Sequence, residues 1–315
     1  MFMRVAILFR HVYFREFCEN VGEALIRRGV SVVLSDNAKE HDVDVLLYVG
    51  VHLFADMPAP SKSLVAGVQT EQLGSGGVQG SPRLQRNRNR FECVKGCYDL
   101  LFDWIPGVCQ SEGRSFLPYG CSPGPLVTEQ KEFDVCFIGN IHHSRREPLL
   151  KSLQQDFNFF PDFSPGFGPA KLAAIQKSRI LLNIRFYEDG GFESPRMFDY
   201  LSLGAFVISE RAAACDPFVP GRDFVDFEGE EQLRLLLKQF LSDEPARARI
   251  AASGHSVCQQ NTWDTVASQL LLAFQSQQKR ASWRRWHGWL QSRVRCWLFS
   301  SRDHLSLIRK TLFRG

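Results

Sequence analysis

Short, uninterrupted runs of apolar residues recur along this chain, and each run is too short to be a typical helix. The first four runs occupy 5–9, 31–36, 43–50 and 63–69. A segment at 15–29 separates the first two and has apolar residues at helical spacing. Strands that are covered on both faces appear as continuous apolar runs, whereas half-exposed strands alternate. The pattern therefore predicts a parallel sheet with helices on both faces, in an α/β domain.

Residues 73–90 interrupt the apolar pattern with glycine, serine, asparagine and arginine. This composition predicts either a long loop or a poorly formed helix. A further buried strand is predicted at 97–104, and the segment 116–124, which contains proline and glycine, turns the chain. We place the end of the first domain just beyond this turn.

A second alternation of strands and helices follows the turn. The predicted strands lie at 133–140, 157–163, 179–186, 205–210 and 223–227. The predicted helices lie at 146–155, 169–178, 195–203 and 230–243, and one or two more close the domain between 245 and 274. A length of 315 residues exceeds one ordinary core and suits two α/β domains. We therefore expect Rossmann-like domains at 1–127 and 128–274, followed by a tail at 275–315.

The overall composition is that of a folded globular protein, with 44% hydrophobic and 23% charged residues. No segment approaches the roughly 20 apolar residues that a membrane-spanning helix needs. The N-terminal apolar run is broken by Arg10 and His11 and lacks a small-residue cleavage site, which favours a first strand over a signal peptide. The nine cysteines are scattered and lack paired metal-binding spacing. We expect a cytoplasmic protein with reduced thiols and no metal site.

Three segments of the second half carry a resemblance to a known family: DVCFIGNIHHSRREPLLKSL, ESPRMFDYLSLGAFVISE and DFVDFEGEEQLRLLLKQFLSD. Over about residues 131–270, the chain resembles the CgeB-like glycosyltransferases, first noted as spore-maturation proteins. The resemblance implies a GT-B fold, in which two Rossmann-like domains face each other across a cleft. It also implies that the C-terminal domain, of the glycosyl transferases group 1 type, binds a nucleotide-sugar donor and that the N-terminal domain binds the acceptor.

Asp199 stands five positions before Gly204, the spacing that the family and the wider retaining GT-B enzymes show between a helix acid and a glycine. The resemblance implies that this carboxylate accepts hydrogen bonds from the ribose hydroxyls of the donor. Aspartate is one carbon shorter than the usual glutamate. The alternative is a residue on an exposed helix face.

Glu193 stands six positions before Asp199, whereas the two acids of the common retaining motif are eight apart. As a loop carboxylate beside two glycines, it is a candidate for binding donor-sugar hydroxyls or stabilising positive charge at the anomeric carbon. A helix cap by Ser194 before Pro195 gives the same segment a purely structural explanation.

Arg196 falls in the first turn of the same predicted helix, where the helix dipole disfavours a cation unless an anion compensates. A diphosphate is such an anion, and exposed backbone N–H groups at a helix start bind phosphate. Ser194 and Arg196 are therefore candidate diphosphate ligands. The alternative for Arg196 is an ion pair with a carboxylate at the protein surface.

A strand-to-helix turn is a second candidate for binding phosphate, because ligands collect at the carboxyl ends of parallel strands. The candidate ligands in this turn are Gly139, Asn140, Arg145 and Arg146. The resemblance implies that Gly139 and a following basic residue meet the donor phosphates and neutralise the leaving group. Asn183 and Glu210 end strands at the same edge, and each either reaches the site or is only a polar strand terminus.

In the first domain, His11 follows the first strand and is a candidate general base on the acceptor side, with a structural role as the alternative. The DxD sequence at 42–44 is a metal motif of another glycosyltransferase class, but it leads directly into an apolar strand. The resemblance implies chemistry without a bound metal. It also implies no cofactor besides the nucleotide diphosphate sugar, which is a co-substrate.

The net charge of +4 is concentrated at the C-terminus, because the last 41 residues hold ten Lys or Arg and a single acid, Asp303. Arginines and tryptophans interleave there. Residues 279–314 fit an anionic surface on the inner face of the cytoplasmic membrane, since such a surface attracts cations and tryptophan sits at headgroup level. A terminal helix packed across the two domains is the first alternative. Binding to RNA or DNA is the least favoured.

We therefore hypothesise a hexosyltransferase-like enzyme that moves a sugar from a nucleotide diphosphate sugar to a cell-envelope glycan, a lipid-linked precursor or a protein. Retention of the anomeric configuration is implied only by the family. The alternative is a catalytically inactive GT-B scaffold that acts as a membrane-docked binding partner in glycan assembly. The departures from the family pattern at Glu193 and Asp199 are the reason for this alternative.

Overall fold

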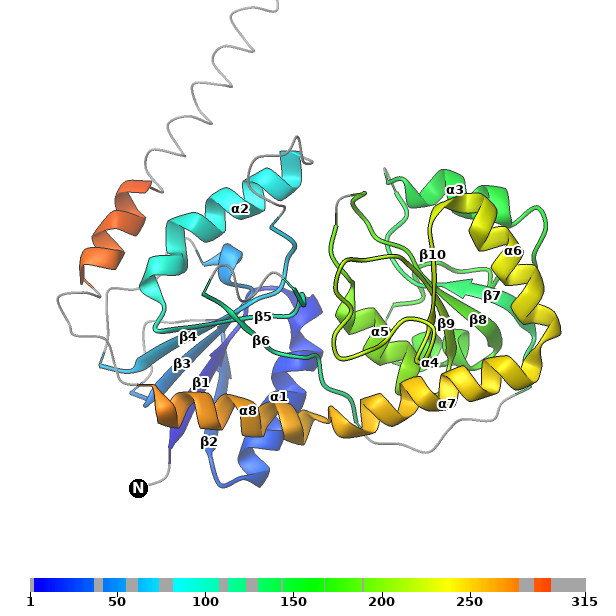
Figure 1. Cartoon of the computed structure of the whole chain (residues 1–315). Coiled ribbons are helices and arrows are strands. Elements are labelled where there is room, and N and C mark those ends of the chain that lie inside the picture. The colour runs from blue at the N-terminus through cyan, green and yellow to red at the C-terminus, as the bar shows by residue number, and fades with distance from the viewer. Residues whose placement is uncertain are drawn as a thin grey trace, which may run out of the picture. The chain divides into compact units, whose positions relative to one another are not determined.

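The computed structural model of the chain describes residues 3–36, 42–54, 62–73, 82–107, 113–122, 130–142, 144–166, 168–188, 190–277 and 286–295. The chain divides into two compact units (Figure 1). The N-terminal unit comprises Met1–Asp103, Cys109–Leu117 and Ala267–Gly315, and the C-terminal unit comprises Trp104–Val108 and Pro118–Val266. The boundary predicted between 127 and 128 falls within 123–129, outside the described residues.

A six-stranded parallel sheet forms the centre of the N-terminal unit, in the order β2-β1-β3-β4-β5-β6. The strands are β1 Arg4–Leu8, β2 Ser31–Ser35, β3 Val45–Val49, β4 Leu64–Gln69, β5 Leu100–Asp103 and β6 Ser115–Phe116. Every residue of β3 and β4 is buried, whereas the edge strand β2 is exposed or half-buried. Most of the continuous apolar runs are therefore strands covered on both faces, as predicted.

In the described part of this unit, helices α1 (Arg15–Arg27) and α2 (Pro82–Val94), three 3-10 turns, the later part of α8 (Trp263–Ser276) and a helix at 286–295 accompany the sheet. The 3-10 turns are η1 Val12–Phe14, η2 Val51–Leu53 and η3 Lys95–Cys97. Helix α2 corrects the prediction of a long loop or poorly formed helix at 73–90. Leu84, Phe91 and Val94 are each 1% exposed and recur at helical spacing, so they bury one face of α2. The arginines between these apolar positions concealed the periodicity, and residues 74–81 lie outside the described part.

The C-terminal unit contains a four-stranded parallel sheet in the order β10-β9-β8-β7. The strands are β7 Phe133–Phe137, β8 Ser178–Asn183, β9 Phe206–Glu210 and β10 Val225–Phe227. The strand predicted at 157–163 is wrong, because this segment makes only an isolated bridge, between Phe159 and Val135 of β7. Phe160 donates its N–H to the Val135 carbonyl at 2.9 Å, but the pairing does not extend into a ladder along β7.

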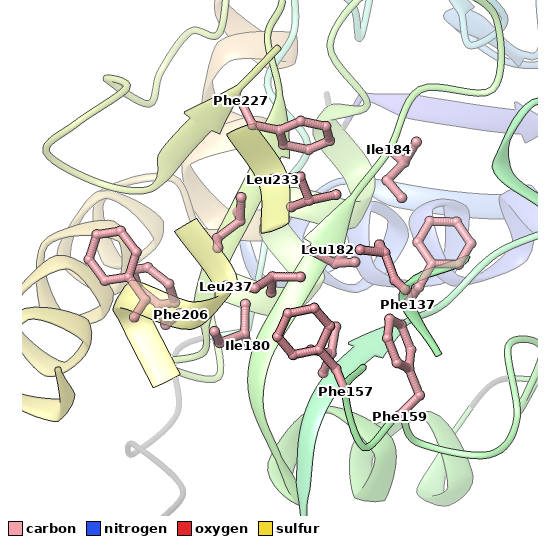
Figure 2. Close-up of a cluster of buried hydrophobic side chains, with 14 of the residues drawn as sticks. Phe137, Phe157, Phe159, Ile180, Leu182, Ile184, Phe206, Phe227, Leu233 and Leu237 are labelled. Carbon is pink, nitrogen blue, oxygen red and sulfur yellow. The ribbon is translucent and has the colours of Figure 1, made fainter. Parts of the chain in front are cut away.

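Among the described residues, five helices pack around this second sheet. They are α3 Arg146–Leu153, α4 Pro169–Gln176, α5 Ser194–Leu201, α6 Gly229–Ser242 and α7 Glu244–Gln260. A buried apolar cluster joins strand residues such as Phe137 and Leu182 to Leu233 and Leu237 of α6 (Figure 2). Close packing of this kind resists movement of the strands and therefore holds the loops at their ends in fixed positions.

The predicted tail at 275–315 is described only up to Gln277 and at 286–295, which is helical. This helix, orange-red in Figure 1, lies beside α2, and Arg295 Nη1 donates to the Glu92 carbonyl oxygen at 3.2 Å. Across the described ranges, no helix combines the length and the apolar character needed to cross a membrane.

Candidate functional site

Polar side chains gather at the carboxyl ends of β7, β8 and β9 in the C-terminal unit. These strands are parallel, so their carboxyl ends meet at one edge of the sheet. Strand β7 has β8 on one side and the hydrogen-bonded segment 157–163 on the other, so the chain reverses its direction of winding at β7. In open α/β sheets, ligands bind where the winding reverses. The loops that leave these strands, at 138–145 and 184–193, therefore form the candidate site.

Glu193 immediately precedes α5, and its carboxylate holds two guanidinium groups. Its Oε1 accepts a hydrogen bond from Arg146 Nη2 at 2.5 Å, and its Oε2 lies 2.8 Å from Arg196 Nη2. The backbone N–H of Phe186 also donates to Oε1, at 2.9 Å. The anion that compensates Arg196 at the start of α5 is therefore a carboxylate of the chain itself. Arg196 is 13% exposed, so this ion pair is not a surface pair.

Arg146 is enclosed by the turn after β7 and the end of β8. Its side chain is 2% exposed, its Nε donates to the Ile184 carbonyl at 2.9 Å, and its Nη1 donates to the Asn140 carbonyl at 3.1 Å. Burial and the nearby Arg196 charge lower the pKa of Arg146 to about 10, although Glu193 opposes this shift. A side chain so enclosed fixes the two loops in position and does not present itself to a ligand.

Arg196 links the start of α5 to β8 and to the turn after β7. Its Nη1 donates to Asn183 Oδ1 at 2.8 Å, and Asn183 Nδ2 donates to Ser209 Oγ at 3.0 Å. Gly139 approaches so closely that a Cβ there would lie 2.9 Å from Arg196 Nη2. Gly139 also has a φ of 154°, which side chains rarely adopt. The turn therefore requires glycine, because the guanidinium occupies the space beside it.

Glu210, the last residue of β9, holds a second pair of arginines. Arg145 binds both carboxylate oxygens at 2.7 Å, Arg185 Nη2 lies 3.3 Å from Oε1, and the Arg185 backbone N–H donates to Oε2 at 3.0 Å. Burial would raise the pKa of Glu210, but the hydrogen bonds and charges of the two arginines outweigh burial and hold the pKa below its ordinary value. Arg145 is 36% exposed, so it is open to solvent while Glu210 is not.

These six side chains form one connected group, which we call the arginine cluster. Its members are Arg145, Arg146, Arg185, Arg196, Glu193 and Glu210. The two halves join at the end of β8, because the consecutive N–H groups of Arg185 and Phe186 donate to Glu210 and Glu193. Within the cluster, four guanidinium groups against two carboxylates leave two positive charges in excess, and Glu188 is a further carboxylate whose charge acts on Arg145. Such a cluster suits a ligand that carries two or more negative charges.

Ser194 and Asn140, both predicted as phosphate ligands, lie in the two loops of the site. Ser194 is the first residue of α5 and is fully buried, and its Oγ has no hydrogen-bond partner within the described residues. Asn140 is exposed, and its Oδ1 accepts the N–H of His142 at 2.9 Å. Asn140 therefore closes the turn after β7, and Ser194 lies at the N-terminus of α5, where the helix dipole favours an anion.

Asp199 lies on α5, three residues after Arg196. Its Oδ2 is 2.6 Å from Nζ of Lys171 on α4, and the two side chains are 25% and 16% exposed. Asp199 is thus half-buried against another helix and does not face open solvent. The next residue, Tyr200, accepts the Ile138 N–H with its hydroxyl at 3.1 Å and so also supports the turn after β7.

Residues 164–272 match the model of a protein family described as "Glycosyl transferase-like". These residues resemble a glycosyl transferase-like domain. The matched stretch includes Glu193, Arg196 and Asp199, whereas Arg145 and Arg146 precede it. No curated protein sequence matches the chain.

Solved structures resemble the chain over most of its length. A structure of the Anabaena HepE protein in complex with UDP and glucose has a TM-score of 0.64 and 10% identity, and the match covers 87% of this chain and 100% of that one. Sucrose-phosphate synthase from Thermosynechococcus elongatus has a TM-score of 0.60 and 11% identity, and the match covers 87% of this chain and 98% of that one. AviGT4, a glycosyltransferase involved in avilamycin A biosynthesis, has a TM-score of 0.56 and 12% identity. The match covers 87% of this chain and 97% of that one. At these identities the likeness shows the fold alone, and it confirms the predicted two-domain, Rossmann-like GT-B fold.

His11 lies in the turn between β1 and η1 of the N-terminal unit, outside the matched residues 164–272. His11 Nδ1 accepts the Tyr13 N–H at 3.3 Å, and the two rings stack with centroids 4.6 Å apart. Its role as a general base stays a prediction.

Of the DxD residues, Asp42 pairs with Arg4 Nη1 at 3.3 Å and Asp44 accepts the Arg4 N–H at 2.8 Å. The described residues contain no group of three potential metal ligands.

Sequence reasoning missed Arg185, Lys171 and Tyr200 around the candidate site. Arg185 stands two residues after Asn183, at the carboxyl end of a predicted strand. Because ligands bind at the carboxyl ends of parallel strands, a cation at this position could have been predicted to belong to the site. Lys171 and Tyr200 gave no such signal. Their partners, Asp199 and Ile138, belong to other elements, and only the folded structure brings each pair together.

Proposed function

We propose that the chain is a glycosyltransferase that binds a nucleotide diphosphate sugar at the arginine cluster of its C-terminal unit. The observation that supports this proposal is the excess of guanidinium groups over carboxylates at the carboxyl ends of β7, β8 and β9. Arginine binds phosphate with two parallel hydrogen bonds, which suits a diphosphate. The glycosyl transferase-like match agrees with this class of reaction.

The proposed reaction breaks the bond between the anomeric carbon of the sugar and the terminal phosphate oxygen. The nucleotide diphosphate leaves with the bonding electrons, and an acceptor hydroxyl forms the new bond and gives up its proton. Fixed positive charge beside the leaving phosphate stabilises the negative charge that develops there. We propose that the arginines supply this charge without a bound metal. His11 remains a proposed base for the acceptor proton, and retention of configuration remains a proposal from the CgeB-like resemblance.

The members of the cluster take different proposed roles. Arg145 is 36% exposed, so it is the arginine that we expect to contact the diphosphate directly. Glu193 holds Arg146 and Arg196, and we propose that it acts by positioning these cations. Asp199 remains the proposed ligand of the donor ribose, with Lys171 fixing its carboxylate.

The acceptor that we propose is a cell-envelope glycan, a lipid-linked precursor or a protein. The alternative of a catalytically inactive scaffold rests only on the departures from the family pattern at Glu193 and Asp199. Slow release of free sugar from the donor, measured in a coupled assay without acceptor, distinguishes an active site from an inactive one.

Isothermal titration with a panel of nucleoside diphosphates and inorganic pyrophosphate tests the donor site. We expect one or more nucleoside diphosphates to bind, and Arg145→Ala to weaken binding. A hydrogen bond to a charged group contributes about 1.5–3 kcal/mol, which corresponds to a roughly ten- to hundredfold change in Kd.

Arg179→Ala is the matched control for this titration. Arg179 is 35% exposed and pairs with Asp134 at 3.1 Å, but both residues lie near the amino ends of their strands. Its loss should leave binding unchanged. If no nucleotide binds the parent chain, or if Arg145→Ala and Asp199→Ala both bind as the parent does, the proposed donor site is wrong.

A further inference from the structure

The helix at 286–295 is fixed to the N-terminal unit by one of its faces. Gly288 packs on Gly96, where an added Cβ would lie 2.4 Å from the Gly96 carbonyl oxygen. Ser292, one turn later, is 5% exposed, and Arg295 donates to the Glu92 carbonyl at 3.2 Å. This approach needs glycine at position 288, whereas a Cβ at Gly96 would lie 3.9 Å from the Gly288 Cα. The helix is therefore seated on the end of α2 and on η3.

The opposite face of the same helix is apolar and open to solvent. Trp286, Leu290 and Val294 are 47%, 53% and 57% exposed and are spaced four residues apart, which places them along one stripe. Leu290 stands two positions after Gly288 and two positions before Ser292. Its side chain therefore leaves the helix roughly 200° around the axis from either residue, on the face opposite to the seated one. The seating of the helix thus turns this stripe outward. Trp289 flanks it, with its ring 5.5 Å from that of Trp286.

Cations lie on the same helix and on the segment against which it packs. Arg293 and Arg295 lie on the helix, and Arg293 Cζ is 5.8 Å from the Trp289 ring centroid. The neighbouring segment 82–97, which forms α2 and η3, carries four arginines and one lysine against a single carboxylate, Glu92. An apolar stripe bordered by tryptophan and cations is the composition of a helix that lies in a lipid headgroup layer.

We propose that the helix at 286–295 docks the protein on an anionic lipid surface. Trp286, Leu290 and Val294 enter the boundary between headgroups and acyl chains, and the cations on this helix and on α2 contact the headgroup phosphates. The helix lies in the plane of the surface and does not cross it. This inference does not rest on the proposed donor site, because it concerns another unit of the chain.

A single-stranded nucleic acid is the competing partner for a cationic surface with tryptophans. Bases stack on aromatic rings, and Trp286 and Trp289 offer such rings. Leu290 and Val294 have no ring on which a base stacks, yet they are as exposed as Trp286. The aliphatic part of the stripe fits acyl chains and not bases, so the observations favour lipid.

Co-sedimentation of the full chain with vesicles tests the proposal. We compare phosphatidylcholine vesicles with vesicles that also contain phosphatidylglycerol, in the absence of nucleotide. The test variant is Trp286→Ser/Leu290→Ser/Val294→Ser, and we expect its partition onto the anionic vesicles to fall by roughly tenfold or more. The parent chain should bind the anionic vesicles and leave neutral vesicles unbound.

The matched control is Val219→Ser/Leu235→Ser/Leu272→Ser, which removes three apolar side chains that are 44%, 63% and 67% exposed elsewhere. It should bind vesicles as the parent does. All six side chains are exposed, so both variants should keep the parent's thermal unfolding temperature. The proposal is overturned if the parent does not bind anionic vesicles, if the test variant binds equally well, or if single-stranded RNA binds the parent while vesicles do not.

Discussion

Arg146 and Glu193 form an ion pair with an Nη2–Oε1 distance of 2.5 Å, and the arginine side chain is only 2% exposed. The same carboxylate also compensates Arg196, at 2.8 Å. One negative charge therefore holds two cations at the start of α5. The arrangement leaves the site positively charged and keeps its loops fixed before any ligand binds.

The first prediction concerns the stability of this ion pair. Glu193→Gln keeps the shape of the side chain but removes its charge, which leaves a buried Arg146 beside Arg196 without their anion. Breaking a buried pair by removing one partner costs about 3–5 kcal/mol. We expect the free energy of unfolding, measured by urea denaturation, to fall by about this amount.

Glu231→Gln on α6 is the control for this measurement, because Glu231 is exposed and lies outside the arginine cluster. A surface substitution of this kind changes stability by less than about 0.5 kcal/mol. Equal stability of Glu193→Gln and Glu231→Gln would show that Glu193 does not compensate the buried cation.

Most of the fold follows from the sequence because fully covered strands have a strong signature. Strands β3 and β4 are buried along their whole length and appear in the sequence as unbroken apolar runs. The segment 157–163 has the same apolar character, but it makes only an isolated bridge to β7, and the prediction failed there. Helix α2 was missed because its polar face is rich in arginine and asparagine, which masked the buried Leu84 and Phe91.

The site was predictable only in part, for a different reason. The sequence places Arg145, Arg146 and Asn183 at strand ends, and parallel strands bring those ends together. The sequence does not show which arginine pairs with which carboxylate. For Arg196 the sequence leaves open a diphosphate or a carboxylate at the surface, and the compensating anion in the structure is Glu193, three residues away in sequence. Pairing across elements, such as that of Lys171 with Asp199, depends on helix packing that no local pattern encodes.

The second prediction concerns the pH dependence of stability at Glu210. The arginines hold the pKa of Glu210 below its ordinary value of 4.5, so the folded state binds a proton less readily than the unfolded state. The resulting stabilisation is present above about pH 4.5 and is lost as the pH falls through the folded-state pKa. Glu210→Gln lacks this contribution at every pH.

Thermal unfolding of the parent and of Glu210→Gln between pH 7 and pH 3 measures this contribution. We expect a constant difference in Tm at neutral and mildly acidic pH, and a difference that narrows once the pH is below about 4.5. Other carboxylates titrate equally in both proteins and cancel in the comparison. A difference that stays constant down to pH 3 would contradict the pairing of Glu210 with the arginines.

The third prediction separates backbone strain from the space that the Arg196 guanidinium occupies. Gly139 and Gly166 both have φ values that disfavour a side chain, 154° and 79°. A Cβ at Gly139 would lie 2.9 Å from Arg196 Nη2, whereas a Cβ at Gly166 would have no atom within 4 Å. Alanine at either position therefore adds strain of about 1–3 kcal/mol, but only Gly139→Ala also displaces the guanidinium.

Urea denaturation and titration with inorganic pyrophosphate, carried out on both alanine variants, distinguish these effects. We expect both variants to lose stability. Only Gly139→Ala should also lose pyrophosphate affinity, by roughly tenfold, because its Arg196 guanidinium is displaced from the position in which it adds positive charge to the site. Gly166→Ala lies in the same unit and should bind as the parent does. If the two variants bind pyrophosphate equally well, the position of Arg196 does not control anion binding, and the anion must then contact Arg145 without help from the start of α5.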